Sequence, residues 1–374
     1  MAAASTLPAV RTSPREVVRI LSLHLLCLVL PGTTFAFLLT TPHPWWASLP
    51  WFGVLVASVI YDKRAPRELR QPADDLPAWP FDALLYLLVA LQIVNLALLV
   101  HMVSAQGFWR VDTLVAALLV GVNSGYSGIV VGHELIHRRE RHLQLLGRVL
   151  MGSVLYEHFY TEHLRGHHAR VGTPADPATA RFGETFHQFF RRTVPGQFKS
   201  AWRLETKRLG DEDMTLLDRR IVGSRVVHGL ALEWAAAFAV LAFFGPGAFV
   251  VYLFQAAVAV RLLEAVNYFE HWGLVRTGKR VLPVDSWDTD SWFTLYTLVG
   301  LSRHADHHAF AMRPYAQLRH CEESPKLPSG YFGMVEMVIF HNREFRKLMT
   351  AELRRRGLGP FAADAATAAA ATAP

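Results

Sequence analysis

The sequence contains little cysteine and little charge. Only Cys27 and Cys321 occur in 374 residues, too few for a disulfide framework or a cysteine-bound metal cluster. Charged residues make up 18% of the chain, against about 25% in soluble proteins. Hydrophobic residues make up 52%, and mean hydropathy is +0.21. These values argue against a soluble protein, and they leave nitrogen and oxygen as the ligands of any metal.

Several binding patterns are also missing. No basic repeat or finger pattern accompanies the formal net charge of +7, so nucleic acid is not expected as a partner. The basic excess suits an anionic membrane face or an acidic protein instead. The chain also has no flavin or nucleotide fingerprint. Any redox chemistry would therefore need a separate electron carrier.

Long apolar runs are what the sequence does have. Six segments are apolar and long enough to cross roughly 30 Å of hydrocarbon as helices. They cover 18–40, 44–61, 82–103, 111–132, 226–244 and 248–268, and 44–61 is the shortest. No alternating ten-residue pattern indicates a barrel. The sequence thus predicts an all-α integral membrane protein with six transmembrane helices and a cytoplasmic helical cap.

Basic residues predict the orientation. With six spans, the loops near 41–43, 104–110 and 245–247 share one side and hold only Arg110. The positive-inside rule then places both termini and most of the polar chain in the cytoplasm, beneath the inner membrane of a bacterium. The expected divisions are a tail 1–17, spans 18–132, a catalytic insert 133–225, spans 226–268, a catalytic region 269–356 and a disordered tail 357–374.

Nine histidines gather in four short motifs on the predicted cytoplasmic side. The motifs are HELIH at 133–137, EHLRGHH at 162–168, NYFEHWG at 267–273 and RHADHH at 303–308. Their histidines are His133, His137, His163, His167, His168, His271, His304, His307 and His308.

The histidine spacing suits metal binding. Side chains three or four residues apart share a helical face, so His133 with His137, and His163 with His167, can each hold one ion. His304 can pair with His307 or His308. At about 100° per residue His168 points away from His163, toward a second ion. Nine imidazoles are too many for one tetrahedral zinc and suit two metals, although imidazole alone does not select the element.

Two other functions fit parts of the pattern. HELIH matches H-E-x-x-H, in which two histidines hold zinc and the glutamate is the general base of a metalloprotease. That interpretation leaves five or six histidines without a role. A transporter is compatible with six spans, but the histidines lie beyond the helices and not at mid-membrane.

The motifs together resemble those of a known enzyme family. HELIH, EHLRGHHARVGTPADPATAR at 162–181, NYFEHWGL at 267–274 and LSRHADHHAFAMRPYAQL at 301–318 are similar to the four signature regions of the integral-membrane alkane monooxygenases. This group is related to xylene monooxygenase and the membrane fatty-acid desaturases. The sequence departs from the family at Trp272, usually Tyr, at Ser302, usually Gln, and at Phe310-Ala311, usually His-Pro.

The resemblance implies a non-haem di-iron enzyme that uses O₂ and has all nine histidines as ligands. It implies rubredoxin or a ferredoxin as electron carrier, with an NAD(P)H-dependent reductase, and a hydrocarbon substrate reached from membrane lipid. Medium or long n-alkanes are the first expectation, alkyl-aromatic methyl groups the second and fatty acyl chains the third. The departures put substrate preference in doubt and not the reaction class.

Four carboxylates stand beside predicted ligands. They are Glu134, Glu162, Glu270 and Asp306. We expect them to accept hydrogen bonds from the ligand imidazoles and so to fix the orientation of those rings.

Polar and small residues inside the spans give three further expectations. Glu233 and Arg261 should lie at similar depth in a helical hairpin and form an ion pair. The repeated glycines of the fourth span, Gly121, Gly125, Gly128 and Gly132, indicate close helix packing more than a substrate path. Trp51, Phe52 and Tyr126 are expected to pack rather than to set a tunnel length.

Overall fold

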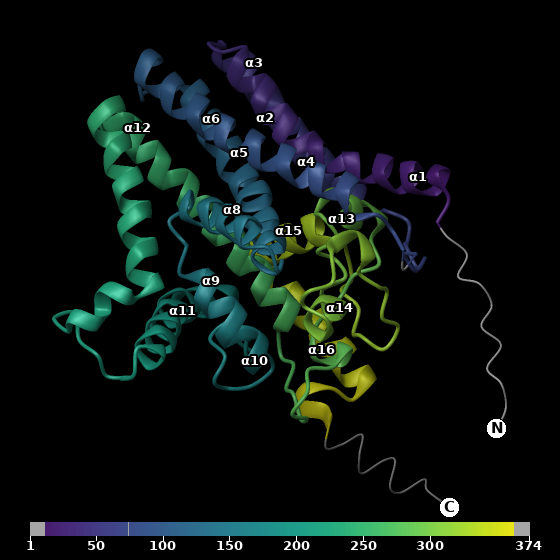
Figure 1. Cartoon of the computed structure of the whole chain (residues 1–374). Coiled ribbons are helices and arrows are strands. Elements are labelled where there is room, and N and C mark those ends of the chain that lie inside the picture. The colour runs from purple at the N-terminus through teal and green to yellow at the C-terminus, as the bar shows by residue number, and fades with distance from the viewer. Residues whose placement is uncertain (1–11, 74, 363–374) are drawn as a thin grey trace, which may run out of the picture.

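A computed structural model describes residues 12–73 and 75–362, and every regular element in this part of the chain is a helix. Two isolated bridges, Arg67 with Ser291 and Asp288 with Lys326, are the sole β-type pairings among the described residues. The all-α prediction is therefore confirmed. Figure 1 shows long helices in one half of the molecule and short helices with loops in the other.

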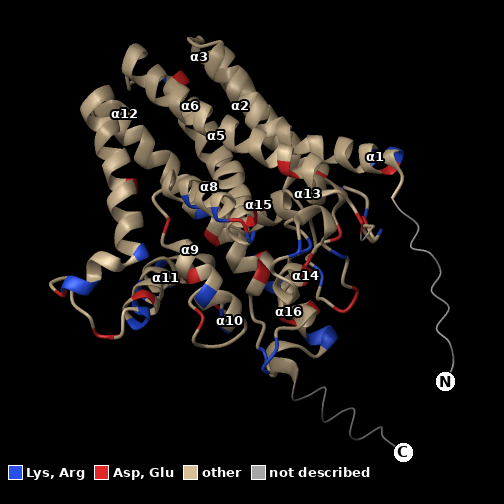
Figure 2. Ribbon diagram, viewed as in Figure 1, with Lys and Arg blue, Asp and Glu red and all other residues tan. Residues whose placement is uncertain are grey.

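Four helices are long and apolar enough to span a membrane. They are Pro14–Leu39, Ala78–Gln106, Val111–Ile136 and Arg225–His271. The first combines α1 (Pro14–His24), η1 (Leu25–Leu28) and α2 (Val29–Leu39), the second is α5, and the third combines α6 (Val111–Asn123), η3 (Ser124–Val130) and α7 (Val131–Ile136). Figure 2 shows few charged residues along α2, α5, α6 and the upper part of α12, as lipid contact requires.

The fourth of these helices, α12 (Arg225–His271), bends sharply within its length. Gly245 has φ +86°, which glycine adopts without strain, and Pro246 follows it. Figure 1 shows the resulting hairpin, whose two arms contain the expected spans 226–244 and 248–268. The expected span 44–61 is three short pieces, α3 (Trp45–Ser48), η2 (Leu49–Phe52) and α4 (Gly53–Asp62). The count of six spans stays a prediction.

The remaining helices are mostly short, although α11 has 23 residues. Along the insert they are α8 (Arg141–Gly152), α9 (Phe159–Glu162), η4 (His163–His167), α10 (His168–Arg170), α11 (Phe186–Arg208) and η5 (Arg219–Gly223). After α12 they are η6 (Pro283–Asp285), α13 (Trp292–Thr297), α14 (His304–Ala309), η7 (Tyr315–Gln317), α15 (Tyr331–Phe340), α16 (Asn342–Arg356) and η8 (Gly359–Phe361). They form the helical cap, and its cytoplasmic placement stays a prediction.

The glycines of α6 and η3 allow α12 to approach closely. A Cβ added to Gly121 would lie 2.8 Å from the Val258 Cβ, and one on Gly125 would lie 3.1 Å from the Leu262 Cδ1. These contacts favour the packing interpretation over a substrate path. Tyr126 is likewise buried, and its hydroxyl donates to the Cys27 carbonyl at 3.0 Å.

The expected ion pair between Glu233 and Arg261 is wrong. The Glu233 carboxylate accepts the Glu157 backbone N–H at 3.1 Å. The Arg261 guanidinium instead lies over the rings of Phe186 and Phe190, at 5.2 and 5.9 Å from their centroids. The two arms of α12 diverge below their bend, so equal distance from the bend does not bring the side chains together (Figure 1).

The predicted disordered tail is ordered at its start. Residues 357–362 include η8, and the Phe361 ring packs edge-on against Phe182. The rest of that tail, and residues 1–11 of the predicted N-terminal tail, lie outside the described residues. The tail 1–17 also ends earlier than expected, because α1 begins at Pro14 with Ser13 as its N-cap.

Candidate metal centre

Four segments that are distant in sequence bring the nine imidazoles together below the apolar helices. His133 and His137 close the third apolar helix, and His271 closes α12. The second motif forms η4 and α10, and the fourth forms α14. His133 is 9% exposed and most of the other eight are more deeply buried, so the cluster is largely shielded from solvent.

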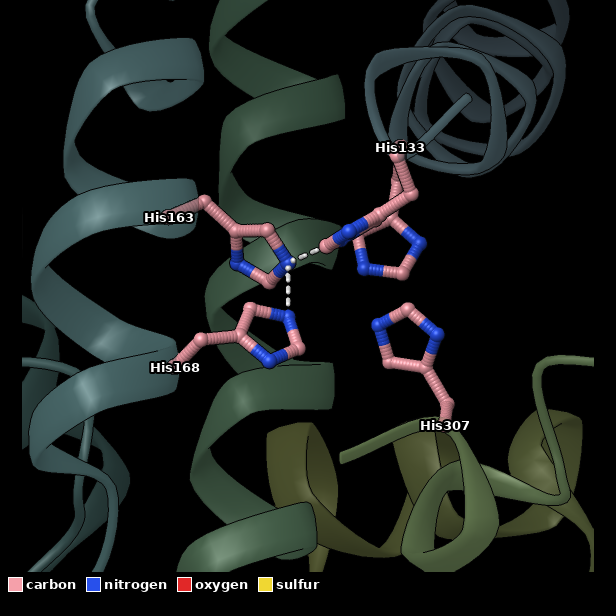
Figure 3. A group of neighbouring side chains, drawn as sticks. His133, His163, His168 and His307 are labelled. Carbon is pink, nitrogen blue, oxygen red and sulfur yellow. Dashed lines mark hydrogen bonds between the residues drawn. The ribbon is translucent and has the colours of Figure 1, made fainter. Parts of the chain in front are cut away.

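Five imidazoles form the first group. One nitrogen from each of His133, His137, His163, His168 and His307 lies within 4.8 Å of the others. The His163 Nε2 is 3.0 Å from both the His137 Nε2 and the His168 Nε2. Figure 3 shows four of these rings directed toward a common centre from different elements. Such a set of converging nitrogens can surround one metal ion.

Four imidazoles form the second group, with His271 at its centre. The His271 Nε2 lies 3.3 Å from the His304 Nε2, and the His167 Nε2 lies 3.3 Å from the His308 Nε2. His167, His271 and His308 form one compact triad, and His271, His304 and Glu270 form another. The shared His271 makes these two triads one site. The nine predicted residues therefore divide into five and four.

The second motif divides differently from the expected pairing. His163 groups with His168, five residues on, while His167 joins the other group. The reason is that η4 is a π-helix and not an α-helix. Its i→i+5 hydrogen bonding brings residues five apart into register, which a repeat of 3.6 residues per turn does not foresee. His133 and His137 do share one group, as their spacing predicts.

Three of the four predicted carboxylates contact arginines and not imidazoles. Glu134 accepts from the Arg138 Nε at 2.9 Å, Glu162 accepts from Arg170 at 2.9 Å, and Asp306 pairs with Arg313. Each of these three acids is directly next to a cluster histidine in the sequence. Adjacent residues on a helix point about 100° apart, so the acid faces away from the cluster.

Glu270 does contact a histidine, but on an unexpected side. Its Oε2 lies 3.3 Å from the His304 Nε2, the nitrogen that faces His271. The Tyr331 hydroxyl donates to its Oε1 at 2.6 Å. Glu270 is thus directed into the cluster, as a ligand carboxylate would be, while Tyr331 holds its outer oxygen.

Asp176 occupies the role expected of the other carboxylates, and sequence reasoning missed it. Its Oδ2 lies 2.9 Å from the His167 Nδ1, on the opposite edge of the ring from the cluster. The Thr179 hydroxyl donates to the same oxygen at 2.6 Å, and the Ala178 N–H donates to Oδ1. The available signal was that Asp176 is one of two acidic residues, with Glu184, in the loop 171–185 between α10 and α11.

Electrostatics favour neutral rings in most of the cluster. Burial and neighbouring imidazoles hold the pKa values of His137, His163, His168, His304, His307 and His308 well below the ordinary value. Burial also acts on His167, but attraction to Asp176 outweighs it and its pKa is raised. Burial opposes ionisation of Asp176, yet His167 and Thr179 lower its pKa to about 2. Neutral rings keep the lone pairs that a metal needs.

The imidazole nitrogens of the cluster are suitable metal ligands. The His307 Nε2, a buried atom, has no hydrogen-bond partner among the described residues. Buried polar atoms without partners are costly, and coordination would satisfy this one. Histidine nitrogens with one carboxylate suit Zn, Fe, Cu or Ni, so the site can hold metal but the ligand set alone does not select iron.

The chain is similar to known proteins over the part that contains all four histidine motifs. Residues 112–337 match the fatty acid desaturase family. Alkane 1-monooxygenase 1 of Pseudomonas aeruginosa is 41% identical over 228 residues, 59% of each chain. Alkane 1-monooxygenase of Acinetobacter baylyi is 33% identical over 75% of this chain and 69% of its own length. The xylene/toluene monooxygenase hydroxylase component of Pseudomonas putida is 26% identical over 55% of each chain.

Proposed function

The chain belongs to the alkane monooxygenases of the fatty acid desaturase family, and from this premise we propose that it hydroxylates the terminal carbon of n-alkanes. The balanced reaction takes an alkane, O₂, two electrons and two protons to a primary alcohol and water. The observation that carries the proposal is the division of nine imidazoles into two adjacent groups. The match spans 59% of the Pseudomonas aeruginosa relative, so activity, substrate and partners are proposed here for the chain.

We assign two irons to the cluster. One would be held by His133, His137, His163, His168 and His307, and the other by His167, His271, His304 and His308 with Glu270 beside them. Iron would supply the activation of O₂ that no amino-acid side chain provides. A single zinc in an H-E-x-x-H site would use only part of this set. In addition, the Glu134 carboxylate that would be its general base binds Arg138 and the Tyr315 N–H.

The protein's own contribution is to position the ligands and exclude water. Asp176 fixes the His167 ring through its Nδ1, and Tyr331 holds Glu270. Such outer partners orient ligand rings and raise their basicity. Burial of the cluster keeps water from competing for the reactive centre. The geometry thus assigns Asp176 and Tyr331 as positioning residues.

The substrate would arrive from the bilayer. Each CH₂ of an alkane favours lipid over water by about 0.8 kcal/mol, so an n-alkane is concentrated near the apolar helices. The imidazoles lie where the third apolar helix and α12 end. Alkyl-aromatic methyl groups are the second candidate substrate, supported by the xylene/toluene relative at lower identity. A fatty acyl chain is the third.

Electrons would come from a small acidic carrier on the cytoplasmic side. We propose rubredoxin or a ferredoxin, reduced by an NAD(P)H-dependent reductase, with the chain in the inner membrane of a bacterium. The carrier would dock on the basic stretch between Arg138 and Arg225. Several arginines of this stretch are paired within the chain, such as Arg148 with Glu157 and Arg192 with Glu184. Arg139 and Arg141 are exposed and available for steering, so turnover at limiting carrier should fall as salt rises.

Metal analysis followed by product identification tests the proposal. The purified chain should contain two irons and, with carrier and reductase, convert a panel of n-alkanes to 1-alkanols. A His307→Ala variant should lose iron and activity, whereas the matched His320→Ala variant, outside the cluster, should keep both. One zinc per chain with peptide cleavage would instead establish the protease. Two irons with no alkanol but hydroxylated xylene would transfer the assignment to alkyl-aromatics.

A further inference from the structure

A polar cavity lies outside the imidazole cluster, although its lining residue Arg303 directly precedes His304 in the sequence. It has a volume of about 260 Å³ and lies between α1, the segment 70–73 and α13. Arg19, Arg70 and Arg303 line it together with Glu16, His24 and Tyr296. Figure 1 shows α1 beside α13 and at a steep angle to α2. Nothing in the proposed reaction uses this cavity.

The cavity lies where lipid and protein meet. On α1, Arg19, Ile20 and His24 face inward and line it, at the spacing of one helical face. On the outer side, Val18 and, at the start of η1, Leu25 are 65% and 47% exposed, and Arg15 and Ser22 are exposed on the same face. A helix whose exposed face combines apolar residues with a terminal arginine suits the membrane interface. Molecules in the adjacent lipid leaflet would therefore reach the cavity mouth.

Arg303 brings a buried positive charge to this cavity. The residue is 7% exposed. Its Nη1 donates to the Leu318 carbonyl and its Nη2 to the Arg70 carbonyl. No carboxylate forms an ion pair with it among the described residues. Asp288, Glu68 and Asp306 act on this charge without direct contact. A buried charge that no carboxylate contacts directly is costly, and an anion in the cavity would offset part of this cost.

The other charges around the cavity do not cancel that of Arg303. Arg19 pairs with Glu16 at 2.5 Å, and Arg70 pairs with Glu68. Three guanidinium groups and one carboxylate, that of Glu16, therefore line the cavity, while Glu68, Asp288 and Asp306 act on Arg303 from outside the lining. Arg19 and Arg70 each keep 40% or more of the side chain exposed, so both can turn toward a ligand. The His24 Nδ1 is buried without a partner among the described residues.

We propose that this cavity binds an oxyanion carried on an acyl chain, with the anion at Arg303, Arg70 and Arg19. Its volume is below the roughly 300 Å³ at which pockets begin to enclose whole drug-sized ligands. The head group would therefore enter while the chain stays in lipid, along the exposed side of α1. Basic pockets on the cytoplasmic side of membrane proteins commonly recognise anionic lipid head groups. A phospholipid phosphate and an alkanoate carboxylate share the required chemistry.

Native mass spectrometry of the full chain in detergent tests this inference without any activity measurement. The probes are phosphatidylglycerol, phosphatidylcholine, decanoate and inorganic phosphate, each added separately. We expect phosphatidylglycerol or decanoate to be retained at least fivefold more than phosphatidylcholine. Arg19→Gln and Arg70→Gln should each reduce this retention at least fivefold. Arg64→Gln is the matched control, because Arg64 is exposed nearby but does not line the cavity.

The outcomes separate the possible ligands. Retention of phosphatidylglycerol identifies a lipid head group, and retention of decanoate alone identifies a carboxylate of alkane size. Equal retention of phosphatidylglycerol and phosphatidylcholine overturns the proposal, as does retention that Arg19→Gln and Arg70→Gln leave unchanged. Binding of inorganic phosphate without either amphiphile overturns the acyl-chain part. Arg303→Gln is reserved for a second step, since its contacts with two carbonyls also serve the fold.

Discussion

Replacing Asp176 should weaken metal binding without dismantling the cluster. Its carboxylate holds the His167 Nδ1 at 2.9 Å in a buried site. A hydrogen bond to a charged group contributes about 1.5–3 kcal/mol, and loss of such an outer partner typically costs 10–100-fold in metal affinity. The two ranges agree, because each factor of ten corresponds to about 1.4 kcal/mol.

Two substitutions separate charge from contact at this position. Asp176→Asn keeps an oxygen that can accept from His167 but removes the negative charge, so we expect about a tenfold loss of affinity. Asp176→Ala removes both and should approach the roughly hundredfold limit. Iron retained by the purified chain is measured against increasing chelator. Thermal unfolding of the metal-free form is measured in parallel, because a purely structural role would lower the unfolding temperature and leave affinity unchanged.

Asp112→Asn is the matched control for Asp176→Asn. Asp112 is equally buried, at 1% exposure, and also contacts a histidine Nδ1, that of His43, which lies outside the imidazole cluster. Its replacement should leave iron retention within twofold of the unmodified chain. Wild-type retention in both Asp176 variants would refute the positioning role, whichever way their stability changes.

Three further predictions concern stability in detergent, each measured by thermal or denaturant unfolding. Gly121→Ala should destabilise the protein by about 1–3 kcal/mol through overpacking, because the added Cβ would lie 2.8 Å from the Val258 Cβ. Gly53→Ala is the control and should be neutral or stabilising, because no atom lies within 4 Å of its added Cβ. Equal effects of the two variants would contradict the close packing of α6 against α12. Asp62→Ala should lower the free energy of unfolding by at least about 2 kcal/mol, because the Asp62 carboxylate accepts hydrogen bonds from Ser291, Thr294 and two backbone N–H groups. A decrease below about 0.5 kcal/mol would argue against a structural role of these four hydrogen bonds. Burial outweighs the Arg148 ion pair and raises the pKa of Glu157 from 4.5 to about 7, so this group should lower stability by up to ~3 kcal/mol as pH rises between these values. Glu157→Gln should make that fall shallower without abolishing it, because burial raises the pKa values of Glu162 and Asp288 to about 7 as well, and an unchanged slope would assign it to other groups.

The sequence was sufficient for whatever depends on composition and on short motifs. Apolar runs predicted the helical fold and the segments on either side of Gly245. The histidine motifs predicted nine residues that the structure brings together. Both signals are local, because hydrophobic length and residue type do not depend on how distant segments pack.

Features that depend on local deviation from an ideal helix, or on three-dimensional packing, were not predictable. Helical angles paired His163 with His167, and the π-turn of η4 changed that pairing. Equal depth suggested a contact between Glu233 and Arg261, but divergence of the arms of α12 separates them. Asp176 lies in an irregular loop, where no periodicity shows which way a side chain points.

The π-turn of η4 makes the number of residues in the second motif critical. Because this one wide turn directs His163 and His168 to one group and His167 to the other, a single stretch of backbone connects both halves of the centre. Shortening it by one residue would restore ordinary α-helical winding, and no rotation of a side chain could then serve both groups. Exchanges of Leu164 and Arg165 should be tolerated far better than any gain or loss of length there, whereas Gly166 has no room for a Cβ beside Glu162 and Arg170.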